Sequence, residues 1–160
     1  MWNKIKTLFK MEKEIKACSI YKTKNKFKIV TAYRLESWAY IESNPITILP
    51  IEASFEQIKN AIFSSINSSK KLSEKEEDFY RLETKEFLKS LRETSYKKFY
   101  NNSTSCSIYI ENNIVEIIPN RLKDYYLVEV KEDIQKIEYN NNEIEITKIV
   151  LDILEKKYVE

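Results

Sequence analysis

The chain contains no glycine and no histidine among its 160 residues, and it has only three prolines and two cysteines. Without glycine it lacks a phosphate-binding loop, a dinucleotide fingerprint and a nucleophile elbow. Without histidine it lacks serine–histidine and cysteine–histidine pairs, histidine-based zinc motifs and any imidazole base. The remaining catalytic chemistry is carboxylates acting with lysine or a hard metal ion. Most enzyme classes are thereby excluded, and we expect no catalytic residues, no metal and no cofactor.

The cysteines and the apolar runs indicate the compartment. Cys106 falls on the apolar side of a predicted strand, which favours a small buried side chain over a disulfide or a nucleophile. Lys4, Lys6 and Lys10 interrupt the N-terminus where a secretory signal would be apolar. No apolar run approaches the length that spans a membrane. With two cysteines and no such signal, we expect a cytoplasmic protein with reduced thiols.

The charges are unevenly distributed along the chain. Residues 1–26 contain eight lysines and two glutamates, whereas the remainder carries 19 basic and 23 acidic side chains. A nucleic-acid-binding domain normally has a basic body, so we expect no direct contact with nucleic acid. Apolar residues recur at helical spacing over residues 3–17 and predict an amphipathic surface helix. Such a helix can also lie on an anionic membrane, but its apolar stripe is narrow and we expect no membrane contact.

The order of elements predicts the fold class. We expect a basic N-terminal helical arm over residues 1–25 and a single domain over residues 26–160. Strands are expected at 26–33, 37–42, 105–110, 114–119, 125–130 and 134–139, with a short edge segment at 46–51 and a possible strand at 97–101. Helices are expected from Ser54, from Ser73 through Arg92 as one or two segments, and from about Asn142. Strands, hairpins and covering helices together predict an α+β fold with a mainly antiparallel sheet.

The segment Ser105–Pro119 is predicted as a tight hairpin although its turn has no glycine. Asn112-Asn113 separates two runs of β-branched and aromatic residues, and asparagine tolerates the positive φ of a primed two-residue turn. This turn sets a register in which Ile110 faces Val115, Ile108 faces Ile117, Tyr109 faces Glu116 and Cys106 faces Pro119. Pro119 has no N–H for a ladder, so we expect it to end its strand.

Two helix starts have capping boxes. Ser54 with Gln57 opens one helix, and Ser73 with Glu76 opens another. The second start carries a run of acids, namely Glu74, Glu76, Glu77 and Asp78. Such a run is usually a solvated helix start favoured by the helix dipole. Its functional alternative is an acidic patch facing a basic partner, and a further alternative is the acidic segment 129–160.

One motif leaves an enzymatic alternative open. Glu129 and Lys131 form a Glu-x-Lys pattern on a predicted strand, with Asp124 five residues before Glu129. Metal-dependent nucleases use such a pair, the acid binding magnesium and the lysine positioning water. Strand alternation predicts the same polar residues facing solvent in any case, and the motif is weak by itself. The aromatic residues, Trp38, Tyr40 and Tyr109 among them, are expected to pack at strand positions because they do not interleave with lysines on one face.

Several short segments carry a family resemblance, namely Ser95-Tyr96-Lys97-Lys98, Ser105-Cys106-Ser107-Ile108 and Ile117-Ile118-Pro119, with Ala32-Tyr33-Arg34 and Pro50-Ile51 … Ser54 … Gln57 … Ala61. Together they resemble the CdiI immunity proteins of bacterial contact-dependent growth inhibition. The similarity extends loosely over residues 27–154, and none of these motifs is catalytic. The basic arm has no counterpart, and Asn112-Asn113 stands where relatives have aspartate-glycine.

The resemblance implies a non-enzymatic cytoplasmic antidote. Its partner would be the C-terminal toxin domain of a cognate CdiA protein, often a nuclease, bound one to one. A nuclease surface is shaped for phosphates and is basic, so carboxylates are its natural complement. On this reading Glu74, Glu76, Glu77 and Asp78 are the candidate toxin-binding residues.

Overall fold

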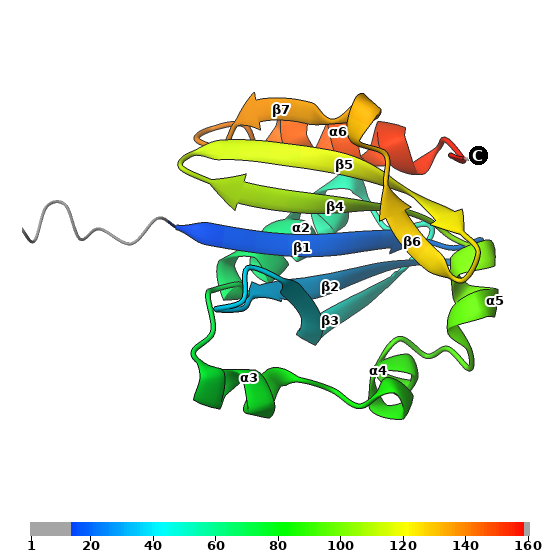
Figure 1. Ribbon diagram of the computed structural model, residues 1–160. Helices are drawn as coiled ribbons and strands as arrows, with labels where there is room; N and C mark the ends of the chain where they lie inside the picture. The colour runs from blue at the N-terminus through cyan, green and yellow to red at the C-terminus, as the bar shows by residue number, and fades with distance from the viewer. Residues whose placement is uncertain (1–13, 159–160) are drawn as a thin grey trace, which may run out of the picture.

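The computed structural model describes residues 14–158 and shows an α+β fold with one sheet (Figure 1). The elements are β1 Ile15–Lys22, β2 Lys26–Arg34, β3 Tyr40–Pro50, α2 Phe55–Ser68, α3 Glu74–Tyr80, α4 Thr84–Ser90, α5 Tyr96–Asn101, β4 Thr104–Glu111, β5 Ile114–Lys123, β6 Tyr126–Glu129, the 3-10 helix η1 Lys131–Asp133, β7 Gln135–Glu138 and α6 Glu143–Leu154. The predicted fold class is confirmed.

The sheet order is β3-β2-β1-β4-β5-β6, and β7 pairs with β5. Every pairing between strands is antiparallel in the described part of the chain. In Figure 1, α2 and α6 lie behind the sheet, and β1, β4 and β5 are seen from the opposite side. We call the face under α2 and α6 the inner face, and the other the outer face.

We expected a helical arm over residues 1–25, and from Ile15 onward that expectation is wrong. Residues Ile15–Lys22 form β1, which lies between β2 and β4 in the sheet. Cys18 and Ile20 are buried on the inner face, and Tyr21 is buried on the outer face, as the alternation of side chains along a strand requires. The segment forms a strand instead of an exposed helix because both of its faces are buried. The rest of the predicted helix, residues 1–13, lies outside the described residues.

The edge strand β3 is longer than expected. β3 joins the strand predicted at 37–42 to the edge segment predicted at 46–51 and runs through Ser43-Asn44-Pro45 to Pro50, with a cis Asn44-Pro45 bond. The register with β2 shifts at this point, between Val30 and Thr31, and the irregularity accommodates the proline. Proline is tolerated here because β3 lies at the sheet edge.

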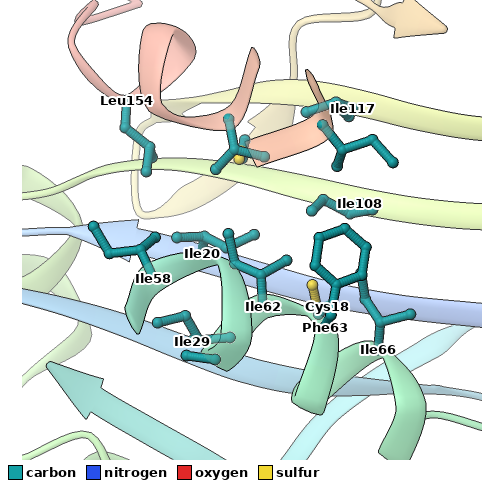
Figure 2. Close-up of a cluster of buried hydrophobic side chains, with 14 of the residues drawn as sticks. Cys18, Ile20, Ile29, Ile58, Ile62, Phe63, Ile66, Ile108, Ile117 and Leu154 are labelled. Atoms are coloured by element: carbon teal, nitrogen blue, oxygen red, sulfur yellow. The ribbon is translucent and has the colours of Figure 1, made fainter. Parts of the chain in front are cut away.

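The main core fills the space between the inner face and the two long helices (Figure 2). The helix α2 starts at the predicted capping box, with Ser54 accepting from the Gln57 N–H and Gln57 from the Ser54 N–H. Its apolar side turns toward the strands, as Figure 2 shows for Ile58, Ile62 and Ile66 beside Ile20 and Ile108. The helix α6 adds Ile146, Val150 and Leu154.

Shorter helices cover one end of the outer face. The buried side chains of Tyr21 and Val30 are covered by Phe87 of α4, by Leu91 at the end of α4 and by Phe99 of α5. The possible strand at 97–101 is therefore wrong, and residues Tyr96–Asn101 form α5. Ser95 caps this helix by accepting from the Lys98 N–H, and its aromatic residues gather on the side facing Tyr21.

The hairpin register is confirmed, with Ile108 opposite Ile117 and Cys106 opposite Pro119. Asn112 and Asn113 have φ values of 53° and 63°, as a primed turn requires. However, Pro119 does not end its strand, because β5 continues to Lys123. The Pro119 carbonyl accepts from the Val130 N–H, so the missing N–H faces away from β4. Pro119 lies between Ile117, the last residue of β5 that pairs with β7, and Asn120, the first that pairs with β6.

Candidate interaction surface

The structure separates the residues of the nuclease alternative. Glu129 ends β6, Lys131 begins η1, and Asp124 lies in the turn between β5 and β6 with a φ of 55°. Lys131 is therefore not two positions along the same strand, as the motif requires. The Glu129 carboxylate accepts the Tyr109 hydroxyl at 2.5 Å. Over residues 14–158, no group of three or more acidic or cysteine side chains is arranged to hold a metal ion.

The predicted acidic run forms α3, and its capping box is confirmed. Glu76 pairs with Lys70 and reaches back to the Ser73 N–H, so the pKa of its carboxyl is lowered by these hydrogen bonds. Glu77 pairs with Arg81 at 2.6 Å. Glu74 and Asp78 are exposed. The four acids thus share one short helix, but two of them already have basic partners within the chain.

The end of α3 is attached to the domain by aromatic packing. The ring of Tyr80 packs against that of buried Tyr33 in a tilted arrangement, with the ring centroids 4.6 Å apart, and the Tyr80 carbonyl accepts the Ser43 hydroxyl. Burial raises the pKa of Tyr33 to about 12. The neighbouring Phe79 is 84% exposed. None of the seven residues of α3 is fully buried, although Glu76, Glu77 and Tyr80 are half-buried, so the helix remains largely accessible to solvent.

A second surface, which the sequence did not predict, lies on the open half of the outer face. Trp38, Arg34, Tyr40, Tyr109 and Glu129 contact one another in that order, and we call this set the outer-face ladder. The Arg34 guanidinium lies 4.3 Å from the Trp38 ring centroid and 5.1 Å from that of Tyr40. The rings of Tyr40 and Tyr109 are 4.9 Å apart. Residues from β2, β3, β4 and β6 are thereby joined across the sheet.

Small side chains beneath the ladder explain its position. One row across the sheet pairs Glu42 with Ala32, Ala32 with Ala17, and Ala17 with Tyr109. Ala17 is 0% exposed and Ala32 is 4% exposed although the helices α2 and α6 lie on the other side. Two alanines side by side leave room for the tyrosine rings to lie over the sheet. The ladder therefore packs like a small satellite core with one side in solvent.

Trp38 does not occupy the strand position predicted for it. It lies in the turn before β3 with a φ of 72°, and its N–H donates to the Leu35 carbonyl. The Ala39 carbonyl accepts from the Leu35 N–H, which closes the turn. As a result the indole is 72% exposed while its face rests on Arg34. The Arg–x3–Trp–x–Tyr spacing is the sequence signal that indicates this arrangement once a hairpin is assumed.

Two tyrosine hydroxyls donate to neighbouring carboxylates and fix their positions. Burial raises the pKa of Tyr109 well above its ordinary value, and the hydrogen bond to Glu129 raises it further. Tyr21 donates to Glu42 at 2.6 Å. Burial raises the pKa of the Glu42 carboxyl, while hydrogen bonds from Tyr21 and Ser19 act in the opposite direction. Both acids are held on the outer face at defined positions.

A hollow of about 250 Å³ opens beside the ladder at the β4–β5 turn. Its lining includes Tyr40, Tyr109, Glu111, Asn112, Ile114 and Glu116. Glu116 lies opposite Tyr109 in the hairpin register and pairs with Lys136 at 3.1 Å. The hollow thus combines aromatic walls with carboxylates at its rim.

The cysteines are structural, as predicted. Cys18 and Cys106 are both free and buried, and burial raises the pKa of each thiol. Both lie in the main core with α2 and α6. Within the part of the chain described, no helix is long and apolar enough to cross a membrane.

Comparison with protein-family models and with curated proteins finds no match. Solved structures do match. A protein of unknown function from Neisseria meningitidis has a TM-score of 0.72 at 16% identity, covering 91% of this chain and 96% of its own. A chain of the CdiA-CT/CdiI toxin and immunity complex from Yersinia pseudotuberculosis has a TM-score of 0.61 at 11% identity, covering 88% and 97%. The chain therefore shares its fold with a component of a toxin–immunity complex.

Proposed function

We propose that this chain is an immunity protein that binds and neutralises the C-terminal toxin domain of a cognate CdiA protein in the cytoplasm. The observation that carries the proposal is the fold shared with a chain of the CdiA-CT/CdiI complex over nearly the full length of both chains. The hairpin Ser105–Pro119, which carries the most specific part of the sequence resemblance, lies at the centre of that fold. The mechanism is occlusion by a one-to-one complex, without catalysis, cofactor, nucleic acid or membrane contact.

Growth protection tests the proposal. The toxin domain encoded immediately upstream would be expressed from an inducible promoter, with and without this chain in the same cells. We expect growth arrest in its absence and growth in its presence. The purified pair should also elute as a one-to-one complex in size-exclusion chromatography with light scattering. A toxin domain that arrests cells expressing the intact chain, and does not bind it, would refute the proposal.

The acidic run of α3 is our first candidate for the toxin contact. Glu74 and Asp78 project from a helix that buries none of its residues, and exposed peripheral carboxylates steer a basic partner during encounter. We propose that Glu74, Glu76, Glu77 and Asp78 act in this way. Their loss would slow association more than it speeds dissociation.

Stopped-flow association of a quadruple variant measures this contribution. The variant replaces Glu74, Glu76 and Glu77 by Gln and Asp78 by Asn, which keeps a capping-box partner for Ser73. We expect slower association at low salt, and a smaller effect near half-molar salt because the screening length falls to a few ångströms. The matched control neutralises four acids of the C-terminal segment, namely Glu138, Glu143, Glu145 and Asp152. If only the control variant associates more slowly, the contact lies on the C-terminal segment and not on α3.

Incubation with plasmid, single-stranded DNA and transfer RNA, with magnesium or manganese, tests the absence of catalysis. We expect no cleavage, because Glu129 is bound by Tyr109 and Lys131 lies in η1. Cleavage that disappears in Glu129→Ala, but persists in Glu132→Ala, would support the nuclease alternative instead.

A further inference from the structure

The open half of the outer face has the composition of a protein-binding site. Trp, Tyr and Arg dominate the energetics of protein interfaces, and three of them adjoin in the outer-face ladder through Trp38, Arg34 and Tyr40. Trp38 is 72% exposed, although its indole is already held against the Arg34 guanidinium. A large apolar surface that is fixed before binding loses little conformational entropy on association.

The hollow next to the ladder is suited to a lysine or arginine side chain. The rings of Tyr40 and Tyr109 and the side chain of Ile114 form apolar walls against which an aliphatic stem can lie. Tyrosine faces attract a cation, and the rim carboxylate of Glu116 accepts its hydrogen bonds. Tyr109 is kept in place because its hydroxyl donates to Glu129 at 2.5 Å.

The charges of this face select the kind of partner. Glu42 and Glu116 belong to the same row across the sheet as Tyr109, and Glu129 lies at the end of the ladder. The cations Arg34 and Lys136 are each already engaged, Arg34 between the two rings and Lys136 with Glu116. Carboxylates around exposed aromatics repel phosphate and attract a basic protein surface.

We infer that the outer-face ladder and its hollow form the central contact with the toxin domain, and that the hollow takes a lysine or arginine side chain of that partner. This inference rests on the proposed function and gives it an interface. The occupant is a basic protein surface, because the carboxylates of this face complement cations. The α3 acids then lie at the periphery and steer the encounter, whereas the ladder holds the complex together.

Binding of the purified toxin domain to three single variants tests the inference. Trp38→Ala removes an exposed ring, Glu116→Lys places a cation at the rim of the hollow, and Phe79→Ala removes the exposed aromatic of α3 as the matched control. Titration calorimetry would give the dissociation constants, and circular dichroism would confirm that each variant is folded. We expect Trp38→Ala and Glu116→Lys each to weaken binding about tenfold or more, and Phe79→Ala to change it less than about threefold.

The outcomes separate this inference from the proposed function. Wild-type affinity in both Trp38→Ala and Glu116→Lys would overturn the ladder as the interface while leaving the immunity function intact. If Phe79→Ala alone weakens binding, the ladder is also overturned as the interface, and the contact lies on α3. A wild-type chain that does not bind the toxin domain would overturn the proposed function and the inference together. A variant in which Trp38 is replaced by Phe should recover most of the affinity, because it restores an aromatic face.

Discussion

The two faces of the sheet are built from different residues and covered to different extents. The inner face presents isoleucines to α2 and α6, helices of 14 and 12 residues. The outer face presents alanine, serine, lysine and tyrosine, and the helices that pack on it, α4 and α5, have 7 and 6 residues. The inner face can therefore supply most of the hydrophobic stabilisation, while the outer face leaves aromatic and charged groups exposed. On our proposal, stability and recognition fall on opposite sides of one sheet.

Truncating a side chain at the centre of the inner face should have the largest effect on stability. Ile117 is 0% exposed between β4 and the helices, so Ile117→Ala should lower the free energy of unfolding by about 2–5 kcal/mol. Ile114, in the same strand but 43% exposed, provides the control, and Ile114→Ala should cost much less. Urea unfolding measures both. Equal losses would contradict the burial difference between these positions.

The outer face contains one buried cation whose partner can be removed. Lys28 is 3% exposed, donates to the Leu91 carbonyl at 2.6 Å and pairs with Glu93. Glu93→Ala leaves the ammonium buried with the carbonyl alone, so we expect a loss of about 1–3 kcal/mol in urea unfolding. Glu86→Ala, an exposed acid of α4, is the control and should change stability little. If Glu93→Ala leaves the free energy of unfolding unchanged, α4 is not held to the sheet through Lys28.

Glu42 should make the outer face sensitive to pH. Its carboxyl pKa is raised by burial, so the folded state binds the proton more tightly than the unfolded state. Stability from this group is present at low pH and is lost as pH rises through the raised pKa. Glu42→Gln should therefore increase the free energy of unfolding at pH 7. That gain should shrink as the pH falls toward the ordinary carboxyl range.

Urea unfolding of the wild type and Glu42→Gln at pH 7 and near pH 4 checks this sign. Glu52→Gln, an exposed acid after β3, is the matched control and should show no such trend. A gain that grows on acidification would contradict the assignment of Glu42 as the group responsible.

Trp38 gives the smallest expected effect on stability. Because its side chain is 72% exposed, Trp38→Ala should change the free energy of unfolding by no more than about 0.5 kcal/mol. Thermal and urea unfolding would measure the change, with Phe63→Ala in the main core as the contrasting variant. A loss comparable to that of Phe63→Ala would show that the ladder stabilises the domain.

Sequence reasoning predicted the fold where local chemistry and long-range packing agree. Asn112-Asn113 fixes the hairpin register by itself, and Ser54 with Gln57 fixes the start of α2. It failed at β1 and α5, where the local pattern is ambiguous and distant contacts decide. β1 is paired along both of its edges, with β2 and with β4, and α5 is held by packing of Phe99 on Tyr21.

The candidate interaction surface was less predictable. The acids of α3 are contiguous in the sequence and are easily noticed there, whereas the outer-face ladder combines residues from four strands and a turn. Tyr40 and Tyr109 meet only because β1 carries Ala17 between their strands, and Trp38 is exposed only because its turn adopts a left-handed conformation. Such a surface depends on register across the sheet, which no single segment encodes.

The position of β1 has a consequence for synthesis on the ribosome. This strand is the first described element of the chain, yet Lys22 pairs with Thr104 and Ile15 with Glu111. While residues between β3 and β4 are being translated, β1, β2 and β3 can already form a meander, but the far side of β1 remains an open edge with free N–H and C=O groups. Unpaired apolar edges of this kind recruit other nascent chains. In that interval β1 presents the strand edge that β4 later covers.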